Sequence, residues 1–242
     1  MERYSVLAEK NPREIVLLRG SGCKWKRCTF CDYHIDCCTD EDENFKLNKS
    51  VLDKVKGIYK KLEVINSGSF CDLDADTMQY ILNICVARKI NTIHFECHWI
   101  HRGEVSKIKE MFGEYGINVR IKTGVETFDV KYRENILKKG FGYASPEKIR
   151  EYADEVCLLF GLDGQTVEGM ECDIETGLRY FDRVCVNIMT KNSTDVKPNE
   201  NVIESFVNNL LPIYKDSDRV DILMENTDFG VGKNGEEVSS YE

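Results

Sequence analysis

Short apolar runs rich in β-branched residues alternate with amphipathic segments along most of this chain, and this alternation limits its possible folds more than any other feature. Seven runs are predicted to be strands: 14–19, 64–70, 92–98, 118–123, 156–161, 184–190 and 220–224. The segments between them are predicted to be helices: 49–62, 76–89, 104–115, 131–138, 146–153, 168–181 and 202–214. Repeated strand–helix units form right-handed crossovers between parallel strands. The pattern therefore predicts an α/β fold with one parallel sheet.

The length of 242 residues suits one domain with a single core. We expect one domain over 1–242, an open or partial β/α barrel with about six or seven parallel strands. In such a fold the active site lies at the carboxyl ends of the strands. The polar, glycine-rich tail after about residue 230 is expected to be mobile.

The charge balance argues against some partners. Lys and Arg total 33 and Asp and Glu total 42, which gives a net charge of −9. An acidic surface repels phosphate backbones, so neither intact nucleic acid nor an anionic membrane is an expected partner. Residues 1–13 lack the apolar run of a signal peptide, and the apolar runs are too short to span a bilayer. We therefore expect a cytoplasmic protein.

The eleven cysteines fall into two groups. Six stand alone in strand-like or helix-like segments, where free cysteine usually acts as a small buried apolar residue: Cys71, Cys85, Cys97, Cys157, Cys172 and Cys185. Disulfides are not expected in a reducing cytosol. The other five crowd into residues 23–38, between a predicted strand and a predicted helix. This crowding indicates a metal site.

The crowded segment contains a C-x4-C-x2-C spacing formed by Cys23, Cys28 and Cys31. Thiolates are soft ligands that suit zinc or iron–sulfur clusters. A structural zinc ion needs a fourth ligand, which His34, Cys37 or Cys38 could supply. A 4Fe–4S cluster on three cysteines would instead leave one iron open to another ligand. The residues alone leave both alternatives possible.

This loop resembles the signature of the radical S-adenosylmethionine (SAM) enzymes. The family has C-x3-C-x2-C with an aromatic residue before the last cysteine, and Phe30 matches that residue. Tyr33 stands where the family often has an adenine contact, and the first gap, 24–27, is one residue longer than usual. The resemblance implies a 4Fe–4S cluster on the three cysteines and SAM on the open iron. It also implies an external electron donor, such as flavodoxin or ferredoxin, and a 5′-deoxyadenosyl radical.

The resemblance also implies which residues contact SAM. The second predicted strand ends in a glycine-containing turn resembling the family's site for the SAM amino group, although the acidic residue often found there is absent. The segment 122–127 resembles turns that face the ribose and carboxylate of SAM, and 160–165 loosely resembles a segment that supports adenine. The implied cofactor-binding residues are Phe30, Tyr33, Ser67, Gly68, Ser69, Lys122, Glu126, Gly164 and Asn187.

Polar side chains near the ends of the predicted strands form a candidate substrate site. These residues are Glu96, His98, Asp163, Glu225 and Asp228. A carboxylate-rich mouth suits a ligand with hydrogen-bond donors or a cation. The short chain, the lack of a second cysteine cluster and the acidic charge favour a small molecule over intact tRNA or protein. The sequence does not identify a catalytic residue.

Among radical SAM proteins, the chain most resembles the queuosine lyase group of bacterial queuine salvage. The compact size, the loop CKWKRCTFCDYH, the turn GVET and the ending ENTDFG carry this resemblance. It implies abstraction of a ribose hydrogen and cleavage of the glycosidic bond of queuosine or queuosine 5′-phosphate, which releases queuine. Two alternatives remain: a radical SAM enzyme acting on another small molecule or on tRNA, and a non-enzymatic zinc-binding interaction module.

Overall fold

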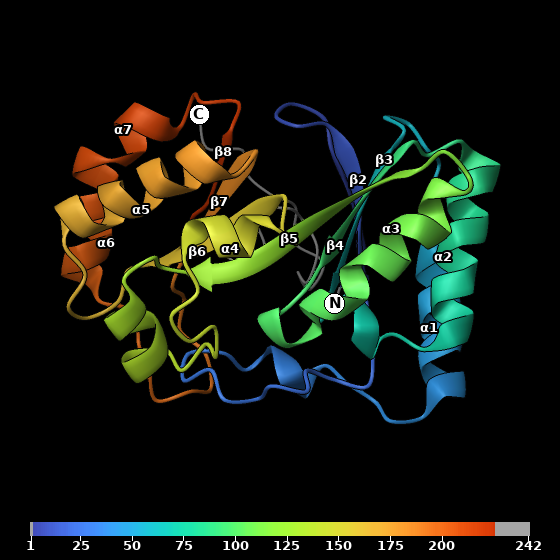
Figure 1. Ribbon diagram of the computed structural model, residues 1–242, viewed down its shortest axis with the longest axis horizontal. Coiled ribbons are helices and arrows are strands. Elements are labelled where there is room, and N and C mark those ends of the chain that lie inside the picture. Colours follow the sequence, from blue (N-terminus) through green and yellow to red (C-terminus); the bar gives the residue numbers. More distant parts are fainter. Residues whose placement is uncertain (1, 226–242) are drawn as a thin grey trace.

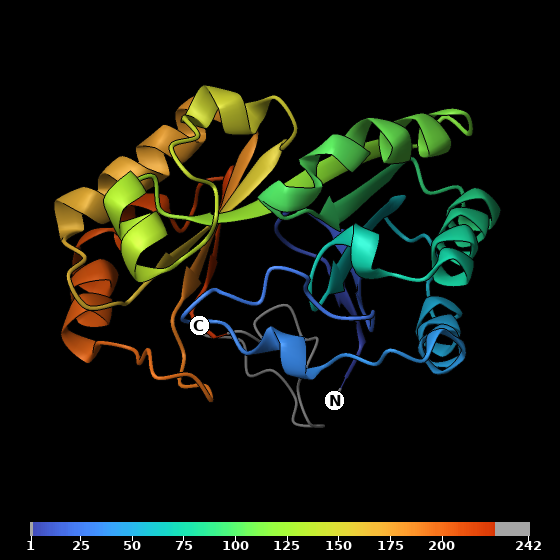
Figure 2. The same cartoon turned by 60° about the horizontal axis from the view of Figure 1, so that its bottom comes forward.

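The computed structural model describes residues 2–225, in which one curled sheet carries all the strands. The strands lie in sequence order: β1 (Tyr4–Leu7), β2 (Arg13–Leu18), β3 (Lys61–Asn66), β4 (Thr92–Glu96), β5 (Asn118–Glu126), β6 (Glu155–Phe160), β7 (Arg183–Ile188) and β8 (Val220–Leu223). β1 is antiparallel to β2, and β2 to β8 are mutually parallel. Figures 1 and 2 show the sheet curled into a half-barrel with the main helices on its outer side. The predicted α/β partial barrel is confirmed.

The helices connect successive parallel strands. They are α1 (Glu41–Leu52), α2 (Ala75–Arg88), α3 (Val105–Gly113), α4 (Pro146–Arg150), α5 (Val167–Tyr180), α6 (Glu200–Asn209) and α7 (Leu211–Tyr214). Four short turns supplement them: the 3₁₀ turns η1 (Tyr33–Ile35), η2 (Phe70–Asp72) and η3 (Trp99–Glu104), and the π-helical turn η4 (Tyr132–Ile136). Side-chain caps fix several helix starts; for example, Asp74 accepts from the N–H of Thr77. Among the described residues, no helix is long and apolar enough to cross a membrane.

Side chains along each strand alternate between the two faces of the sheet. Apolar side chains form the outer layer, and charged side chains line the interior. Side chains such as Val64, Phe95 and Ile121 point toward the helices and are at most 1% exposed. Their neighbours in sequence point into the half-barrel, because successive side chains of a strand face opposite ways. Glu63 and Lys122 are two of these inward residues, and both are buried. The main core therefore lies between sheet and helices, which leaves the interior free for polar groups.

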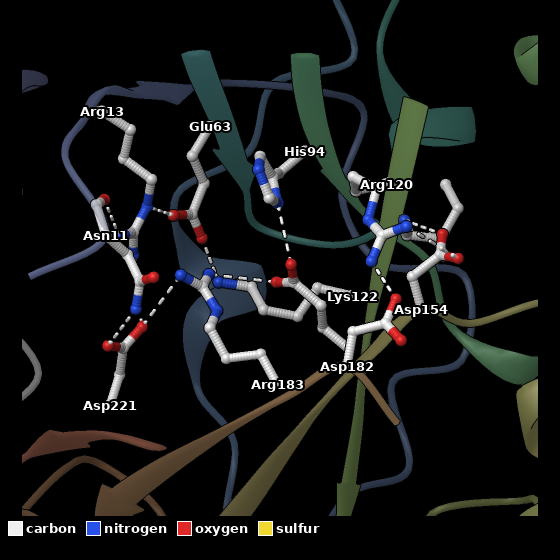
Figure 3. Close-up of polar contacts among 12 residues, drawn as sticks. Asn11, Arg13, Glu63, His94, Arg120, Lys122, Asp154, Asp182, Arg183 and Asp221 are labelled. Atoms are coloured by element: carbon white, nitrogen blue, oxygen red, sulfur yellow. Dashed lines mark hydrogen bonds and ion pairs between the residues drawn. The ribbon is translucent and has the colours of Figure 1, made fainter. Parts of the chain in front are cut away.

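Ion pairs fill the interior near the amino ends of the strands (Figure 3). Glu63 pairs with both Arg13 and Lys122. Arg183 pairs with Glu155 at 3.0 Å and with Asp221 at 3.2 Å. Burial alone would raise the pKa of Glu63, but the Lys122 and Arg13 cations overcome this effect and hold it well below its usual value. We call these six residues the charged floor of the half-barrel.

The turn between β1 and β2 closes the half-barrel at the same end. The side-chain amide of Asn11 donates to the carbonyl of Asp218 at 3.2 Å and to Asp221 Oδ1 at 3.0 Å. Lys10 Nζ donates to the carbonyl of Lys215 at 3.0 Å. These bonds join the first hairpin to the chain around the start of β8. The barrel is thus held together at the amino ends of its strands, and its carboxyl ends carry the long loops.

The predicted helix 49–62 is wrong, because α1 ends ten residues earlier and β3 has begun by residue 61. The carboxylate of Glu14 accepts main-chain N–H bonds from Lys56, Gly57 and Ile58 at 2.7, 2.6 and 2.9 Å. These bonds hold the segment in a turn, where Gly57 has a φ of +74° and Ile58 is 51% exposed. A tertiary contact from β2 therefore overrides the helical spacing of apolar residues.

Other differences concern the ends of strands and one cysteine. The predicted strand 64–70 stops at Asn66, where the chain turns, and the strand predicted at 118–123 continues to Glu126. The antiparallel strand β1 was not predicted. Of the six isolated cysteines, Cys172 is exposed on α5, so its assignment to the core is wrong. The other five are buried or partly buried.

Candidate functional site

The segment 20–38, which we call the cysteine loop, follows β2 and lies along the edge of the sheet where the parallel strands end. Figure 1 shows it along the lower edge of the molecule, together with the segments that follow β3, β5 and β7. Figure 2 brings the same loop forward. Three groups of hydrogen bonds attach the loop to these segments. The cysteines therefore lie where an active site was predicted.

The first attachment joins the loop to the turn after β3. The N–H of Cys23 donates to the carbonyl of Ser67 at 3.1 Å. A Cβ on Gly68 would lie 3.2 Å from Cys23 Cα and 2.4 Å from Asp72 Oδ2, so this turn requires glycine. Ser69 Oγ accepts from the N–H of His98 at 2.9 Å. The turn predicted to bind the SAM amino group thus lies directly against the first cysteine.

The second attachment joins the loop to the segment after β5. Thr29 Oγ1 donates to the carbonyl of Ile136 at 2.8 Å, and Trp25 Nε1 donates to the carbonyl of Lys138 at 2.8 Å. The Trp25 ring covers Gly140, where a Cβ would come within 2.2 Å of the ring. Gly140 has a φ of +76°, so both space and backbone conformation favour glycine there.

The third attachment joins the loop to the segment after β7. Asn192 Nδ2 donates to the carbonyl of Phe30 at 2.6 Å. Asp32 Oδ2 accepts from the main-chain N–H and the hydroxyl of Ser193 at 2.9 and 3.0 Å. Phe30 and Asp32 flank Cys31, so these bonds fix the chain on both sides of the last cysteine of the motif.

The three motif cysteines are free, partly exposed thiols. The N–H of Cys31 donates to the carbonyl of Cys28 at 3.4 Å, and Cys23 lies in the same loop. Burial raises the pKa of Cys28 and raises that of Cys31 to about 11, while the Lys139 ammonium acts in the opposite direction. Three neighbouring thiols on one loop fit a 4Fe–4S cluster, in which each thiolate holds a different iron.

The remaining cysteines of the loop have other surroundings. Cys37 packs over Gly22, its Sγ 3.1 Å from where a Cβ on that glycine would lie. Cys38 Sγ lies 3.7 Å from Glu43 Oε2, at the start of α1. Among residues 2–225, no three or more His, Cys, Asp or Glu side chains converge to hold a single metal ion.

A buried ion pair lies beside the cysteine loop. Lys139 Nζ is 2.9 Å from Glu126 Oε1, and each side chain is 9% exposed. Glu126 ends β5 with a φ of +68°, next to an irregularity in the pairing with β6. Lys139 Nζ also lies 5.7 Å from the centre of the Phe30 ring. Sequence analysis placed Glu126 at the site but missed Lys139, because no motif includes it.

Glu96 and Lys122 are register neighbours on β4 and β5, and both face the interior, Lys122 as part of the charged floor. Burial raises the pKa of Glu96 to about 7, although the charge of Lys122 favours the ionised form. Lys122 pairs with Glu63. Asn187 faces the same interior from β7 and is partly exposed. The predicted residues Glu96, Lys122 and Asn187 thus share the inner face of the sheet.

His98 is held by main-chain groups at both ring nitrogens. Nδ1 accepts from the N–H of Ile100 at 3.3 Å, and Nε2 bonds to the carbonyl of Lys139 at 2.8 Å. Burial and the nearby Lys139 cation lower the pKa of His98 to about 3, so the ring is neutral. The ring stacks on Trp25 with centroids 5.5 Å apart, and Phe141 meets it edge-on. His98 therefore joins the cysteine loop to the segment after β5.

The other predicted site residues lie at the rim. Asp163 and Gly164 are exposed on the turn after β6, where the carbonyl of Asp163 accepts from the Tyr132 hydroxyl at 2.6 Å. Tyr33 is 56% exposed on η1. Glu225 is exposed just beyond β8. Asp228 and the tail after about residue 230 lie outside the described residues.

No family model matches the chain, and no curated protein matches it by sequence. Among solved structures, the chain is similar to a queuine lyase from Clostridium spiroforme bound to SAM and queuine. The two chains are 41% identical with a TM-score of 0.92, over 96% of this chain and 100% of that one. The Bacillus subtilis protein ydhD, matched over 85% of this chain and 78% of that one, has a TM-score of 0.34 at 10% identity, and this likeness carries no argument.

A parallel half-barrel with a three-cysteine loop across the carboxyl ends of its strands is the architecture of a radical SAM enzyme. The match to the Clostridium spiroforme structure spans both the sheet and this loop, since it covers almost all of the chain. The chain belongs to the queuine lyase family of radical SAM enzymes.

Proposed function

We propose that the protein cleaves the glycosidic bond of queuosine or queuosine 5′-phosphate and releases queuine. The observation that carries this proposal is the 41% identity, over the full length of that chain, to a queuine lyase bound to SAM and queuine. The cysteine loop at the mouth of the half-barrel supports it, because a radical enzyme must place its cluster beside its substrate.

The cluster would be held by Cys23, Cys28 and Cys31. When bound, the 4Fe–4S cluster and SAM supply the radical that attacks the ribose. The turn Ser67–Ser69 and Glu126 adjoin the loop and are proposed to hold the amino acid and ribose ends of SAM. The further proposed SAM contacts are Phe30, Tyr33, Lys122, Gly164 and Asn187.

The interior of the half-barrel is proposed to receive the base. Glu96 is a partly buried carboxyl group beside the charged floor, and its pKa of about 7 lets it exchange a proton near neutral pH. Its ionised form can accept from the N–H donors of a deazaguanine edge, and its protonated form can donate. Asp163, Glu225 and Asp228 are proposed to act nearer the rim. His98, with both ring nitrogens engaged, is proposed to support the loop in place of its predicted role in substrate binding.

An external one-electron donor such as flavodoxin or ferredoxin is the proposed protein partner. The cysteine loop presents the exposed cations Lys24, Lys26 and Arg27, although the whole chain has a net charge of −9. Local positive charge of this kind suits an acidic partner, because it guides the encounter toward the cluster.

The test is anaerobic incubation of reconstituted protein with SAM, a reductant and queuosine or its 5′-phosphate, followed by chromatography and mass spectrometry. We expect queuine and 5′-deoxyadenosine to form together. Guanosine is the matched control nucleoside and should release no guanine. Formation of 5′-deoxyadenosine with neither queuosine substrate cleaved would show that the substrate is another molecule. A protein that binds zinc but no cluster would contradict the reaction class.

A further inference from the structure

We propose that the fixed positive charge of Lys139 makes the cluster easier to reduce. Glu126 holds the Lys139 side chain in place, and its negative charge partly offsets that of the ammonium. This inference rests on the proposed function, because it requires a cluster on Cys23, Cys28 and Cys31. Reduction adds an electron to a group that already bears thiolate charge. A fixed cation beside that group in a poorly solvated site stabilises the reduced state.

Lys139 is fixed by contacts at its main chain and its side chain. Its N–H donates to the carbonyl of Arg133 at 3.1 Å, and its own carbonyl accepts from His98 Nε2 at 2.8 Å. Its Nζ donates to Glu126 Oε1 at 2.9 Å. With a side chain that is 9% exposed, the ammonium has little water to screen its charge.

The ammonium lies beside the aromatic residue of the cysteine motif. Nζ lies 5.7 Å from the centre of the Phe30 ring, and Phe30 stands between Cys28 and Cys31 in the chain. The cation therefore lies beside the segment of the cysteine loop that carries Cys28 and Cys31.

The backbone is shaped around this ion pair. A Cβ on Gly124 would lie 2.4 Å from Glu126 Oε1 and 3.2 Å from Lys139 Nζ, so the glycine leaves the space that the pair occupies. Glu126 adopts a φ of +68°, a left-handed conformation that is unfavourable for a residue with a side chain. The end of β5 accepts this strain where it places a carboxylate against Lys139.

The experiment is an anaerobic potentiometric titration of the reconstituted cluster without SAM, followed by electron paramagnetic resonance of the reduced cluster. Lys139→Met should make the midpoint potential more negative. The equilibrium constant for reduction should fall at least tenfold, which corresponds to about 59 mV for one electron. Glu126→Gln should move it in the positive direction. Lys139→Arg keeps the charge, and Lys138→Met removes a neighbouring exposed cation, so both should leave it near the wild-type value.

The opposite signs separate a charge effect from a structural one. Midpoints that stay unchanged, or that move in the same direction in Lys139→Met and Glu126→Gln, overturn the inference. If Lys139→Met fails to hold a cluster, Glu126→Gln decides alone, and an unchanged midpoint there overturns it. A wild-type protein without a cluster overturns the proposed function as well. A normal wild-type cluster with unmoved variants overturns only the role of Lys139.

Discussion

The main-chain N–H of Cys23 donates to the carbonyl of Ser67 at 3.1 Å, so the first cysteine of the motif and the turn after β3 form one hydrogen-bonded unit. In the proposed function this unit has two tasks, because Cys23 holds an iron and the turn holds the amino acid end of SAM. A change in the turn should therefore affect both the cluster and the binding of SAM.

Replacing any of Cys23, Cys28 or Cys31 with alanine should abolish the cluster, because each thiolate is expected to hold a different iron. Wild-type protein should contain about four irons and four sulfides per chain. Cys37→Ala and Cys38→Ala are matched controls within the same loop and should retain the full content. Iron and sulfide analysis of anaerobic protein is the measurement, and loss of the cluster in either control would show that the ligands are misassigned.

Gly68→Ala should weaken SAM binding and lower the free energy of unfolding by about 1–3 kcal/mol. The added methyl group would press on Cys23 Cα and on Asp72 Oδ2, which accepts a hydrogen bond from the N–H of Ser69 in the turn. Gly113→Ala is the control, since a Cβ at that position on α3 meets nothing within 4 Å. Calorimetric titration with SAM and urea denaturation are the measurements. Wild-type SAM affinity in Gly68→Ala would separate the turn from the SAM site.

Glu96→Gln should reduce queuine release at least tenfold and change the pH dependence of stability. The pKa of Glu96 is raised to about 7 in the folded protein, from about 4.5 when unfolded. The folded state then holds a proton that the unfolded state releases, so wild-type stability falls as pH rises between these values and stays lowered above pH 7. The amide removes this cost, which is of order 1–3 kcal/mol.

Urea midpoints of wild type and Glu96→Gln at pH 5 and pH 8 test this expectation. The amide variant should be relatively more stable at pH 8 than at pH 5. If the two urea midpoints differ by the same amount at pH 5 and at pH 8, Glu96 is not the group that titrates between these pH values. Full queuine release by the variant would remove Glu96 from the substrate site, whatever the stability result.

Glu63→Gln should destabilise the fold by about 3–5 kcal/mol, because it leaves the buried Arg13 and Lys122 cations without their shared carboxylate. Lys49→Ala is the control. It breaks an exposed pair with Asp53, in which both side chains are almost half exposed, and should cost less than about 1 kcal/mol. Equal urea midpoints for the two variants would show that the charged floor contributes no more than a surface ion pair.

Local patterns in the sequence predicted the sheet and the position of the cysteine loop. Parallel strands that are buried on both faces appear in the sequence as apolar runs. Cys23, Cys28 and Cys31 are close enough in the sequence to lie in one loop. The helix 49–62 failed because Glu14, far away in sequence, bonds the turn at Gly57. A helix-spacing pattern contains no information about such a contact.

Lys139 was missed for a related reason. The segment 131–138 was predicted to be an amphipathic helix, and only the single π-helical turn η4 forms there. The chain beyond it folds under the cysteine loop, where Trp25 covers Gly140. From the sequence alone, a lysine in such a segment is predicted to be an exposed surface residue. Only the folded position of the cysteine loop shows that it is covered. Its surroundings include the cysteine loop, which lies more than a hundred residues earlier in the chain.

The three attachments of the cysteine loop bear on when, during folding, the proposed cluster can be inserted. The bond from Trp25 to Lys138 closes a separation of 113 residues, and that from Asn192 to Phe30 closes one of 162. Contacts so distant in sequence form late, because long loops must close first. A nascent chain in which β7 has not yet been synthesised contains all three motif cysteines. It lacks the third attachment, which comes from the segment after β7. We therefore expect the proposed cluster to be inserted only after the barrel has closed.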